Sequence, residues 1–449
     1  MLRIKALLSI LLVVIMVLGG WALTKNAQFT YAQTSTNDWP MFHYDPAHTG
    51  YTPTQALTSP PVVIWSSPSQ TIELQASETS PVVANGMVYI TSGDLFAYNA
   101  STGKQIWDVS NGGTNPIVNG NIVYAGGIAY NAFTGAELWS PNPAGATVCQ
   151  AFSNGYLYVQ QYTANFPQVG AHVDALLCLN ATTGAQIWSA PTNFIGSDAA
   201  VADGMLYMAG SYNGSNGKLY AFSASTGAEA WSFPVSYVQT NAQGDSPAVY
   251  GGIVYTVSSD DNVYALNATD GAKIWDFKTG FFVESCPAVA NGVVYVSSDD
   301  GNLYALNAEN GAEIWNYTTS GGASSPAVAG NVVYVGGVNG NLYALDASNG
   351  NKLWNFTLQP PSNEGQLYDF LCSPAVVNGR VYIGSNTHVV TVLGEASNIT
   401  PTPSSTPKVP ELSWPVTAIF VVATTAIVFL ICRKRLKTKH TSMISGEKT

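Results

Sequence analysis

The chain has 449 residues, of which only 10% are charged, whereas Gly, Tyr and Trp number 42, 24 and 11. This composition excludes a charge-rich disordered chain, a coiled coil and a nucleic-acid-binding protein. The net charge of −11 is unevenly distributed. Residues 1–32 carry +3, residues 433–449 carry +5, and the region between them has seven basic and 26 acidic residues, a charge of −19. The central region is therefore strongly acidic, and we expect no nucleic-acid partner.

The N-terminal residues 1–32 have the pattern of a secretory signal. Two basic residues precede an apolar run of signal-peptide length, residues 6–18. Ala32 offers a small residue for cleavage, and Ala27 offers another. We predict a signal peptide over 1–32, with an uncleaved anchor as the alternative, and a following chain that lies outside the membrane.

A lead-in, residues 33–59, precedes a long repeated region, residues 60–395. The repeat is clearest in three successive units, 246–275, 286–315 and 325–354, each of which has Pro-Ala-Val near its start and ends in Trp. The recurring tryptophans are Trp65, Trp107, Trp139, Trp188, Trp231, Trp275, Trp315 and Trp354. All but the first follow a glycine by four residues, namely Gly103, Gly135, Gly184, Gly227, Gly271, Gly311 and Gly350. Spacings of 32 to 49 residues between tryptophans are near the period of β-propeller blades.

Each unit has the pattern of four short strands, of which the Trp segment is the last. Turns rich in Asn, Asp and Gly separate the strands, as in antiparallel hairpins. The last unit, 373–394, lacks a Trp strand, whereas the first Trp strand, 61–65, lacks preceding strands. Joining the two closes a ring without free edges at the junction. We predict an all-β, eight-bladed propeller of four-stranded antiparallel blades, with seven blades as the alternative and a distorted blade at the short second unit, 115–139.

The chain after the repeats has the organisation of a membrane-anchored surface protein. Residues 396–413 contain alternating Thr, Pro and Ser, which form an extended stalk without a core. Residues 414–432 are 19 uncharged positions, enough for one transmembrane helix. The basic tail 433–449 marks the cytoplasmic side. We therefore expect a plasma-membrane protein with its propeller on the extracellular face.

The repeat has a recognisable signature. The unit Ala-x-Asn/Asp-x-x-Thr-Gly-x-x-x-Trp, seen in full over 97–107, resembles the tryptophan-docking motif of pyrroloquinoline quinone-type (PQQ-like) propeller repeats. Residues 39–50, Trp-Pro-Met-Phe-His-Tyr-Asp-Pro-Ala-His-Thr-Gly, resemble the lead-in before such propellers, and the segment from Val409 onward resembles the anchor of archaeal surface proteins. The resemblance covers about 35–395. It implies that each Trp and Gly above is a docking residue between blades, with an aromatic carbohydrate platform as the alternative.

The resemblance leaves two classes of function open. Some members are quinoprotein dehydrogenases that hold the quinone and Ca²⁺ in the central funnel, and others are non-catalytic scaffolds. The enzymes carry adjacent cysteines, whereas Cys149, Cys178, Cys286 and Cys372 are scattered here, and no Cys-x-x-Cys-His haem motif occurs. We expect three of them, Cys149, Cys286 and Cys372, to be buried thiols in place of the Ser of the repeat. No cofactor is required under this interpretation, and PQQ or Ca²⁺ is the alternative.

Acidic residues recur shortly before the first strand of several units. They are Glu78, Asp198, Asp245, Glu284 and Asp369. These loops surround one mouth of a propeller's channel, where five carboxylates would attract a cation such as Ca²⁺. The alternative is that a domain with a charge of −19 carries acids in most of its loops.

Seven Asn-x-Ser/Thr sequons suggest a glycoprotein. They lie at Asn99, Asn180, Asn213, Asn267, Asn316, Asn355 and Asn398. Because repetition itself generates several of these sequons, Asn213 in a loop and Asn398 in the stalk are the better candidates.

These features favour a non-catalytic cell-surface propeller that binds or scaffolds an extracellular protein or glycan. The alternative is a quinone- or Ca²⁺-dependent oxidoreductase outside the membrane. The anchor, the stalk and the missing cysteine pair support the first function.

Overall fold

The structure of the protein is a computed structural model. It describes residues 38–67, 80–110, 115–141, 146–162, 173–192, 194–212, 215–236, 246–283, 285–320, 324–337, 339–357, 372–384 and 390–396. The chain divides into two units, 1–398 and 399–449, and the second lies outside the described residues. The predicted signal peptide, transmembrane helix and tail, and the stalk beyond residue 396, also lie outside them. Within the described ranges, no helix is long and apolar enough to cross a bilayer.

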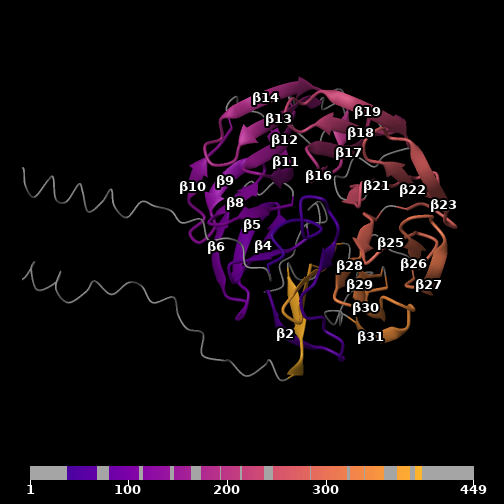
Figure 1. Ribbon diagram of the computed structural model, residues 1–449. Coiled ribbons are helices and arrows are strands. Elements are labelled where there is room, and N and C mark those ends of the chain that lie inside the picture. Colours follow the sequence, from indigo (N-terminus) through magenta and orange to yellow (C-terminus); the bar gives the residue numbers. More distant parts are fainter. Residues whose placement is uncertain are drawn as a thin grey trace, which may run out of the picture. The chain divides into compact units, whose positions relative to one another are not determined.

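Eight antiparallel sheets stand around a common centre in the first unit (Figure 1). In chain order, the first four blades are β3 (Val82–Ala84), β4 (Met87–Ser92), β5 (Asp94–Asn99) and β6 (Gln105–Val109); β7 (Ile117–Asn119), β8 (Ile122–Ala125), β9 (Ile128–Asn131) and β10 (Glu137–Trp139); β11 (Ala146–Ser153), β12 (Tyr156–Tyr162), β13 (Val173–Asn180) and β14 (Gln186–Pro191); and β15 (Ile195–Gly196), β16 (Ala200–Ala202), β17 (Met205–Tyr212), β18 (Ser215–Ser223) and β19 (Glu229–Pro234). Each blade begins with its innermost strand and ends with its outermost.

The remaining blades follow the same order. They are β20 (Ala248–Tyr250), β21 (Ile253–Val257), β22 (Asn262–Asn267) and β23 (Lys273–Lys278); β24 (Ala288–Ala290), β25 (Val293–Ser297), β26 (Asn302–Asn307) and β27 (Glu313–Thr318); β28 (Ala327–Ala329), β29 (Val332–Gly336), β30 (Asn341–Asp346) and β31 (Lys352–Thr357); and β32 (Ala375–Val377), β33 (Arg380–Ile383), β34 (Thr391–Gly394) and β2 (Val62–Ser66). A two-residue strand, β1 (Tyr51–Thr52), adds to the inner edge of the seventh blade. The eight-bladed prediction is confirmed.

The eighth blade is built from both ends of the repeated region. Strand β2 pairs antiparallel with β34, with Val62 opposite Gly394 and Trp65 opposite Val392. The early Trp strand therefore completes the late unit, as the sequence predicted. In the short second blade, the outermost strand β10 has only three residues and a shift in register between Glu137 and Trp139.

The core lies between neighbouring blades, because side chains alternate across each sheet. In β25, Val294 and Val296 pack against the fifth blade, whereas Tyr295 between them packs against the seventh. Strands covered on both faces are apolar at nearly every position. This pattern explains the Val-Val-Tyr-Val sequence of the unit.

At the rim, each blade docks on the next through its Trp. The Trp275 indole lies over Gly311, where an added Cβ would be 2.7 Å from the ring, and its Nε1 donates to the Ala308 carbonyl at 2.9 Å. Gly311 has φ +72°, which glycine adopts without strain. The same approach joins Trp65 to Gly103, Trp107 to Gly135, Trp139 to Gly184, Trp188 to Gly227, Trp231 to Gly271 and Trp315 to Gly350. The eighth Trp, Trp354, has a different partner, described below.

Candidate functional site

The centre of the ring is occupied by the chain's own lead-in. We call residues 38–57 the axial plug; its indigo trace lies inside the ring in Figure 1. Most of its large side chains are buried, namely Trp39, Met41, Phe42, His43, His48 and Leu57. The segment is thus part of the core rather than a tether before it.

The plug binds donors that the repeat presents toward the axis. Each innermost strand pairs with only one other strand of its own blade, so the N–H of its middle residue points inward without a partner from that blade. Plug carbonyls accept these N–H groups from Val83, Val118, Val201, Val249, Val289 and Val328. Carbonyls of Thr52 and Gln55 accept from turns of the seventh and eighth blades. The plug thereby bonds to the first two blades and to the fourth through eighth.

The plug follows the inside of the ring by means of an unusual backbone. His43, Tyr44 and His48 have φ of +52°, +76° and +56°, a region that few residues other than glycine enter. The Asp45 carboxylate holds the bend by accepting from the Thr49 N–H and hydroxyl, at 3.0 and 2.6 Å. At Gly50, an added Cβ would lie 2.9 Å from the Cβ of Ala288. The local sequence therefore suits one tight path against the inner strands.

The plug also supplies the missing dock for the seventh blade. Trp354 Nε1 donates to the Leu57 carbonyl at 2.8 Å, where the other tryptophans use a carbonyl of the next blade. Tyr334 receives the Leu57 N–H at 2.6 Å and donates its hydroxyl to the Leu57 carbonyl at 3.2 Å. Leu57 therefore links the axis to the rim at the closure of the ring.

Above the plug, the residues that precede the innermost strands form a polar belt. We call this set the axial belt: Ser80, Asn115, Asp198, Ser246, Cys286, Ser325 and Ser373. Neighbouring members are joined by hydrogen bonds, such as Ser373 N to Ser80 Oγ at 3.0 Å and Ser80 N to Asn115 Oδ1 at 3.1 Å. Asn115 Nδ2 in turn donates to Asp198 Oδ2 at 2.6 Å. These bonds join the eighth blade to the first and the first to the second, and they link the second blade to the fourth.

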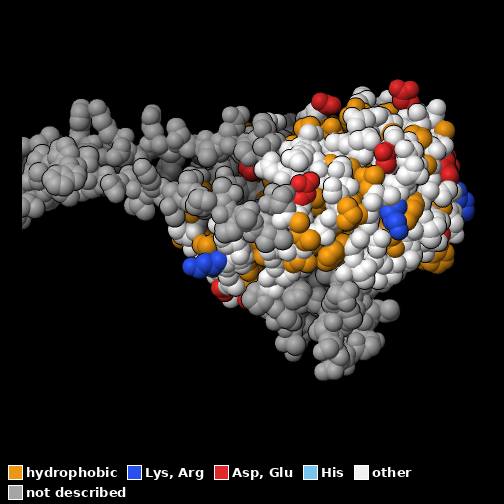
Figure 2. Space-filling model, turned by 90° about the horizontal axis from the view of Figure 1, so that it is seen from below, with side chains coloured by type: hydrophobic (Ala, Val, Ile, Leu, Met, Phe, Trp, Pro, Cys, Tyr) orange, Lys and Arg blue, Asp and Glu red, His pale blue; other side chains and the backbone are white. Residues whose placement is uncertain are grey.

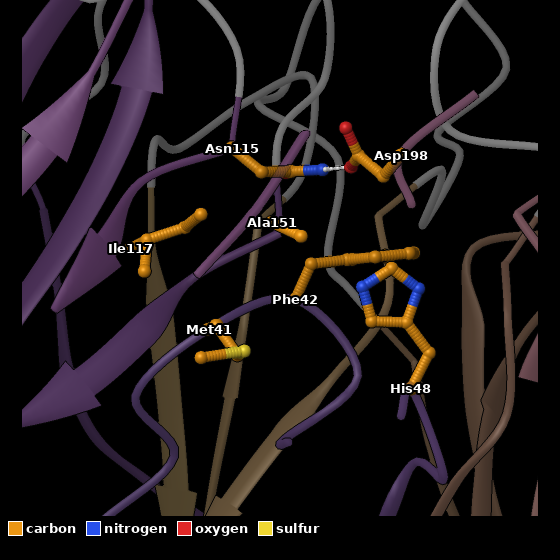
Figure 3. A pocket seen from close by; sticks show the side chains of 7 residues that line it. All are labelled: Met41, Phe42, His48, Asn115, Ile117, Ala151 and Asp198. Carbon is orange, nitrogen blue, oxygen red and sulfur yellow. Dashed lines mark hydrogen bonds between the residues drawn. The ribbon is translucent and has the colours of Figure 1, made fainter. Parts of the chain in front are cut away.

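A small cavity lies where the plug meets the belt (Figure 3). It is lined by Met41, Phe42, His48, Asn115, Ile117, Ala151 and Asp198. Its volume of about 10 Å³ is near the minimum that one water molecule needs. The cavity is therefore too small for an organic cofactor or substrate.

Burial disfavours the charged forms of the ionisable groups at this junction. Burial raises the pKa of Asp198 to about 7, although the hydrogen bond from Asn115 acts in the opposite direction. Burial lowers the pKa of His48 to about 3, with a further contribution from His43, whose own pKa falls to about 4. Within the described ranges, no group bonds to Asp198 Oδ1. Ionising a side chain at this junction therefore costs free energy, as expected for a packed interior.

Of the five predicted acids, only Asp198 belongs to the described part of the chain; Glu78, Asp245, Glu284 and Asp369 lie outside it. Asp198 is a belt residue packed against the plug. No group of three or more His, Cys, Asp or Glu side chains suited to a metal occurs among the described residues. The acidic ring therefore stays a prediction, as do Asn213 and Asn398, which also lie outside these ranges.

Three of the cysteines are buried free thiols. Cys372 bonds to Gly384 through its sulfur, as Ser324 bonds to Gly336 one blade earlier, so the thiol replaces a Ser of the repeat. Burial raises the pKa of Cys286 to about 12 and that of Cys178 to about 11, which keeps these sulfurs protonated and unreactive. The side chain of Cys149 lies outside the described residues.

The described bore does not fit a quinone. A bound quinone needs a cradle on the axis, but among the described residues the plug main chain bonds to the innermost strands there, and the cavity beside it has room for about one water molecule. Sequence reasoning missed this role of the plug. The one available signal was the density of Trp, Met, Phe, His and Tyr in 39–44, unusual for an exposed lead-in.

The comparisons with known proteins agree with this architecture. A family model described as outer membrane protein assembly factor BamB, a PQQ-type repeat, matches residues 62–127, 125–276 and 215–434. These matches cover most of the chain, which therefore belongs to this family of propeller repeats.

Individual relatives are more distant. Tetrathionate hydrolase of Acidithiobacillus ferrooxidans is 31% identical over 114 residues, which are 24% of this chain and only 19% of that protein. Quinohemoprotein alcohol dehydrogenase ADHIIG of Pseudomonas putida superposes with a TM-score of 0.60 at 14% identity, over 80% of each chain. BamB of Moraxella catarrhalis superposes with a TM-score of 0.55 at 19% identity, over 74% of this chain and 98% of BamB. Both structures show a shared fold, in an enzyme and in an assembly factor.

Proposed function

We propose that the chain is a non-catalytic cell-surface propeller that binds or scaffolds an extracellular protein or glycan. One observation carries this proposal: among the described residues, the axial plug bonds along the innermost strands, on the axis where a propeller enzyme of this family would hold its cofactor. A partner would then bind on the outer faces of the propeller rather than on the axis. The proposal includes the signal peptide, the helix 414–432 as anchor and a cytoplasmic basic tail.

The described surface offers one prominent binding feature, a pair of exposed aromatic rings. Phe281 and Phe282 are 48% and 39% exposed, and their ring centroids are 4.3 Å apart. Their main chain is held by the sixth blade, because Ser298 Oγ donates to both carbonyls and Asp299 N donates to the Phe282 carbonyl at 2.9 Å. A rigid aromatic pair loses little conformational entropy when a partner packs on it.

Acidic groups border these rings. Asp300 Oδ2 accepts from the Gly280 N–H at 2.7 Å, and Asp299 is exposed beside it. An apolar platform edged by carboxylates suits the face of a sugar or a basic, apolar segment of a protein. We assign partner binding to this platform.

A matched pair of double and single variants tests the proposal. Phe281→Ser with Phe282→Ser removes the platform, whereas Phe133→Ser removes another exposed Phe, 44% exposed, in a turn of the second blade. We expect the double variant to lose binding on a glycan array or crosslinking to neighbours on intact cells, and the control to keep it. Equal binding by all three proteins would refute the assignment of this surface.

The alternative is a quinone- or Ca²⁺-dependent oxidoreductase, which the fold shared with the quinohemoprotein keeps open. Reconstitution of the full chain with the quinone and Ca²⁺, followed by dye-linked oxidation of alcohols or sugars, distinguishes the two. Turnover that Glu284→Ala abolishes would overturn the scaffold proposal. We expect no turnover above that of the free quinone.

A further inference from the structure

The seven sequons occupy different structural positions, and five of them lie in the described part of the chain. Asn99, Asn180 and Asn267 end the third strand of their blades, and Asn316 and Asn355 lie in outermost strands. We propose that, among the five sequons in the described part of the chain, Asn316 and Asn355 are N-glycosylated, while the three turn asparagines stay unmodified. This inference rests on the extracellular location in the proposed function.

The turn asparagines have a structural reason to be Asn. Asn99 Oδ1 accepts from the N–H groups of Ser101 and Thr102, at 3.0 and 2.9 Å, and so shapes the turn. Other blades place Asn131, Ser223, Asn307 or Asp346 at this position, all with an acceptor oxygen. The turn therefore requires an acceptor, and a sequon arises there as a by-product. These asparagines are also half-buried beneath the next Trp dock.

The outer-strand asparagines have no such reason. The position after the Trp is Asp108, Ser140, Ser189, Ser232 and Asp276 in other blades, so the fold does not require Asn there. The Thr two residues later donates its hydroxyl to an Asn of the neighbouring strand, Thr318 to Asn302 Oδ1 and Thr357 to Asn341 Oδ1. The fold does not require Thr there, since Pro191, Pro234 and Lys278 stand at the same place. Yet two successive blades carry the full sequon, Asn316-Tyr317-Thr318 and Asn355-Phe356-Thr357.

The geometry suits the modification. Both side chains are exposed on extended edge strands, β27 and β31, where an enzyme reaches the main chain from outside the ring. Asn316 Nδ2 donates to Glu313 Oε1 at 2.7 Å, and Asn355 Nδ2 donates to Asn341 Oδ1 at 3.3 Å. An amide nitrogen has two hydrogens, so each keeps this bond after one hydrogen is replaced by a sugar.

The reaction is a group transfer without a redox step. The donor is an oligosaccharide linked through phosphate to a membrane lipid. The Asn Nδ2 forms a bond to the anomeric carbon, the bond from that carbon to the phosphate oxygen breaks, and the lipid phosphate leaves with the electron pair. The amide proton passes to a base of the transferase.

A glycan at these positions would protect a vulnerable surface. Ile314 and Leu353 are 47% and 38% exposed, and each lies two residues before a sequon Asn, on the same face of its strand. The outermost strands also have unpaired edges. Figure 2 shows hydrophobic side chains exposed along the visible rim. In the first and fifth blades the corresponding position is an Asp, Asp108 or Asp276. A charge there would protect the exposed strand edge, as we propose the glycan does.

Mass spectrometry of the full chain, purified from membranes of its own host, tests the inference. We expect glycopeptides at both outer-strand sites and unmodified peptides at the three turn sites. Asn316→Gln and Asn355→Gln each remove the mass of one glycan, Asn267→Gln removes none, and Thr318→Ala abolishes modification of Asn316 without replacing it.

Three outcomes overturn the inference, and only one of them touches the proposed function. Unmodified outer-strand sites in a chain that external protease cleaves on intact cells refute glycosylation but leave the surface location standing. Unmodified sites in a chain that protease reaches only after lysis refute both. Sugar on the turn asparagines at the level of Asn316 also refutes it, because the assignment depends on the difference between the two positions.

Discussion

The rim and the axis of the ring are stabilised in opposite ways. At the rim, one contact recurs seven times with little variation, a Trp over a Gly of the next blade. At the axis, the repeat offers equivalent valine N–H groups, but a single segment without internal repetition binds them. The rim contacts thus recur because the sequence repeats, whereas the axial contacts are made by one segment that occurs only once.

This difference teaches how a repeat protein makes a distinct centre. The plug has no internal symmetry to match the equivalent donors around the axis. It reaches six of them, the valine N–H groups named above, by changing its backbone direction at residues such as His43 and His48. The rim tolerates sequence drift between blades because each dock is local. The axis depends on one segment and has no second copy to replace it.

The strongest test of this comparison removes the plug. Deletion of residues 38–57 removes nine carbonyl acceptors, that of Leu57 included, each worth about 1 kcal/mol, and four buried apolar side chains worth about 1.5–3 kcal/mol each. That loss exceeds the usual stability of a domain, about 5–15 kcal/mol. We expect no cooperative unfolding transition by circular dichroism. Deletion of residues 33–37 is the control and should leave the transition unchanged; an intact transition in both deletions would show that the plug is dispensable.

The same contrast explains what was predictable from the sequence. The blades were predictable from alternating side chains and turns in a unit that occurs many times, because each copy supports the assignment of the others. The joining of 61–65 to 373–394 follows from counting strands. The plug occurs once, and its contacts join residues such as Leu57 and Trp354, 297 positions apart. Only the folded ring brings such partners together.

The candidate site was less predictable than the fold. Sequence spacing placed Asp198 in a ring of loop acids, because it lies just before an innermost strand. The structure adds what spacing does not contain: its neighbours are Asn115 of the second blade and the plug residues Phe42 and His48. A carboxylate in this setting is governed by burial rather than by its distance from other acids.

A single added methyl group tests the rim. At Gly311, an added Cβ meets the Trp275 ring at 2.7 Å with φ at +72°, so Gly311→Ala combines overpacking with backbone strain. We expect a loss of about 3–5 kcal/mol in the free energy of unfolding by urea denaturation. Gly292→Ala in the same blade is the matched control, since φ is +78° and no atom lies within 4 Å of the new Cβ. It should cost only about 1 kcal/mol of strain, and equal losses would contradict the docking role of Gly311.

The axial belt is tested by pH. Asp198 has a pKa of about 7 when folded and 3.8 as its reference value, so the folded chain holds a proton that the unfolded chain releases between these values. Its contribution to stability therefore falls as pH rises from about 4 to 7. Asp198→Asn avoids this loss and should stabilise the protein by about 4 kcal/mol at pH 8, with no difference at pH 3.5. Urea denaturation of both proteins at the two pH values measures it, and a variant less stable at pH 8 would show that the charged form is favoured.

The prediction with the smallest expected effect removes one tyrosine hydroxyl from each of two Trp contacts, one with the next blade and one with the plug. Tyr295 donates only to the Ala347 carbonyl, which Trp315 Nε1 also reaches, so Tyr295→Phe leaves that carbonyl bonded. Tyr334 instead both donates to the Leu57 carbonyl and accepts the Leu57 N–H at 2.6 Å. Tyr334→Phe keeps the carbonyl bonded through Trp354 but leaves a buried N–H without its acceptor.

A buried donor without a partner costs about 1–3 kcal/mol, whereas loss of one bond to a carbonyl that keeps another costs about 0.5–1.5 kcal/mol. Tyr334→Phe should therefore lower the free energy of unfolding by about 1 kcal/mol more than Tyr295→Phe in urea denaturation. Because the two substitutions remove the same atom at equivalent positions, the difference isolates the link between plug and rim. Identical losses would mean that Leu57 serves only as another carbonyl, and that the axis adds nothing to the dock of the seventh blade.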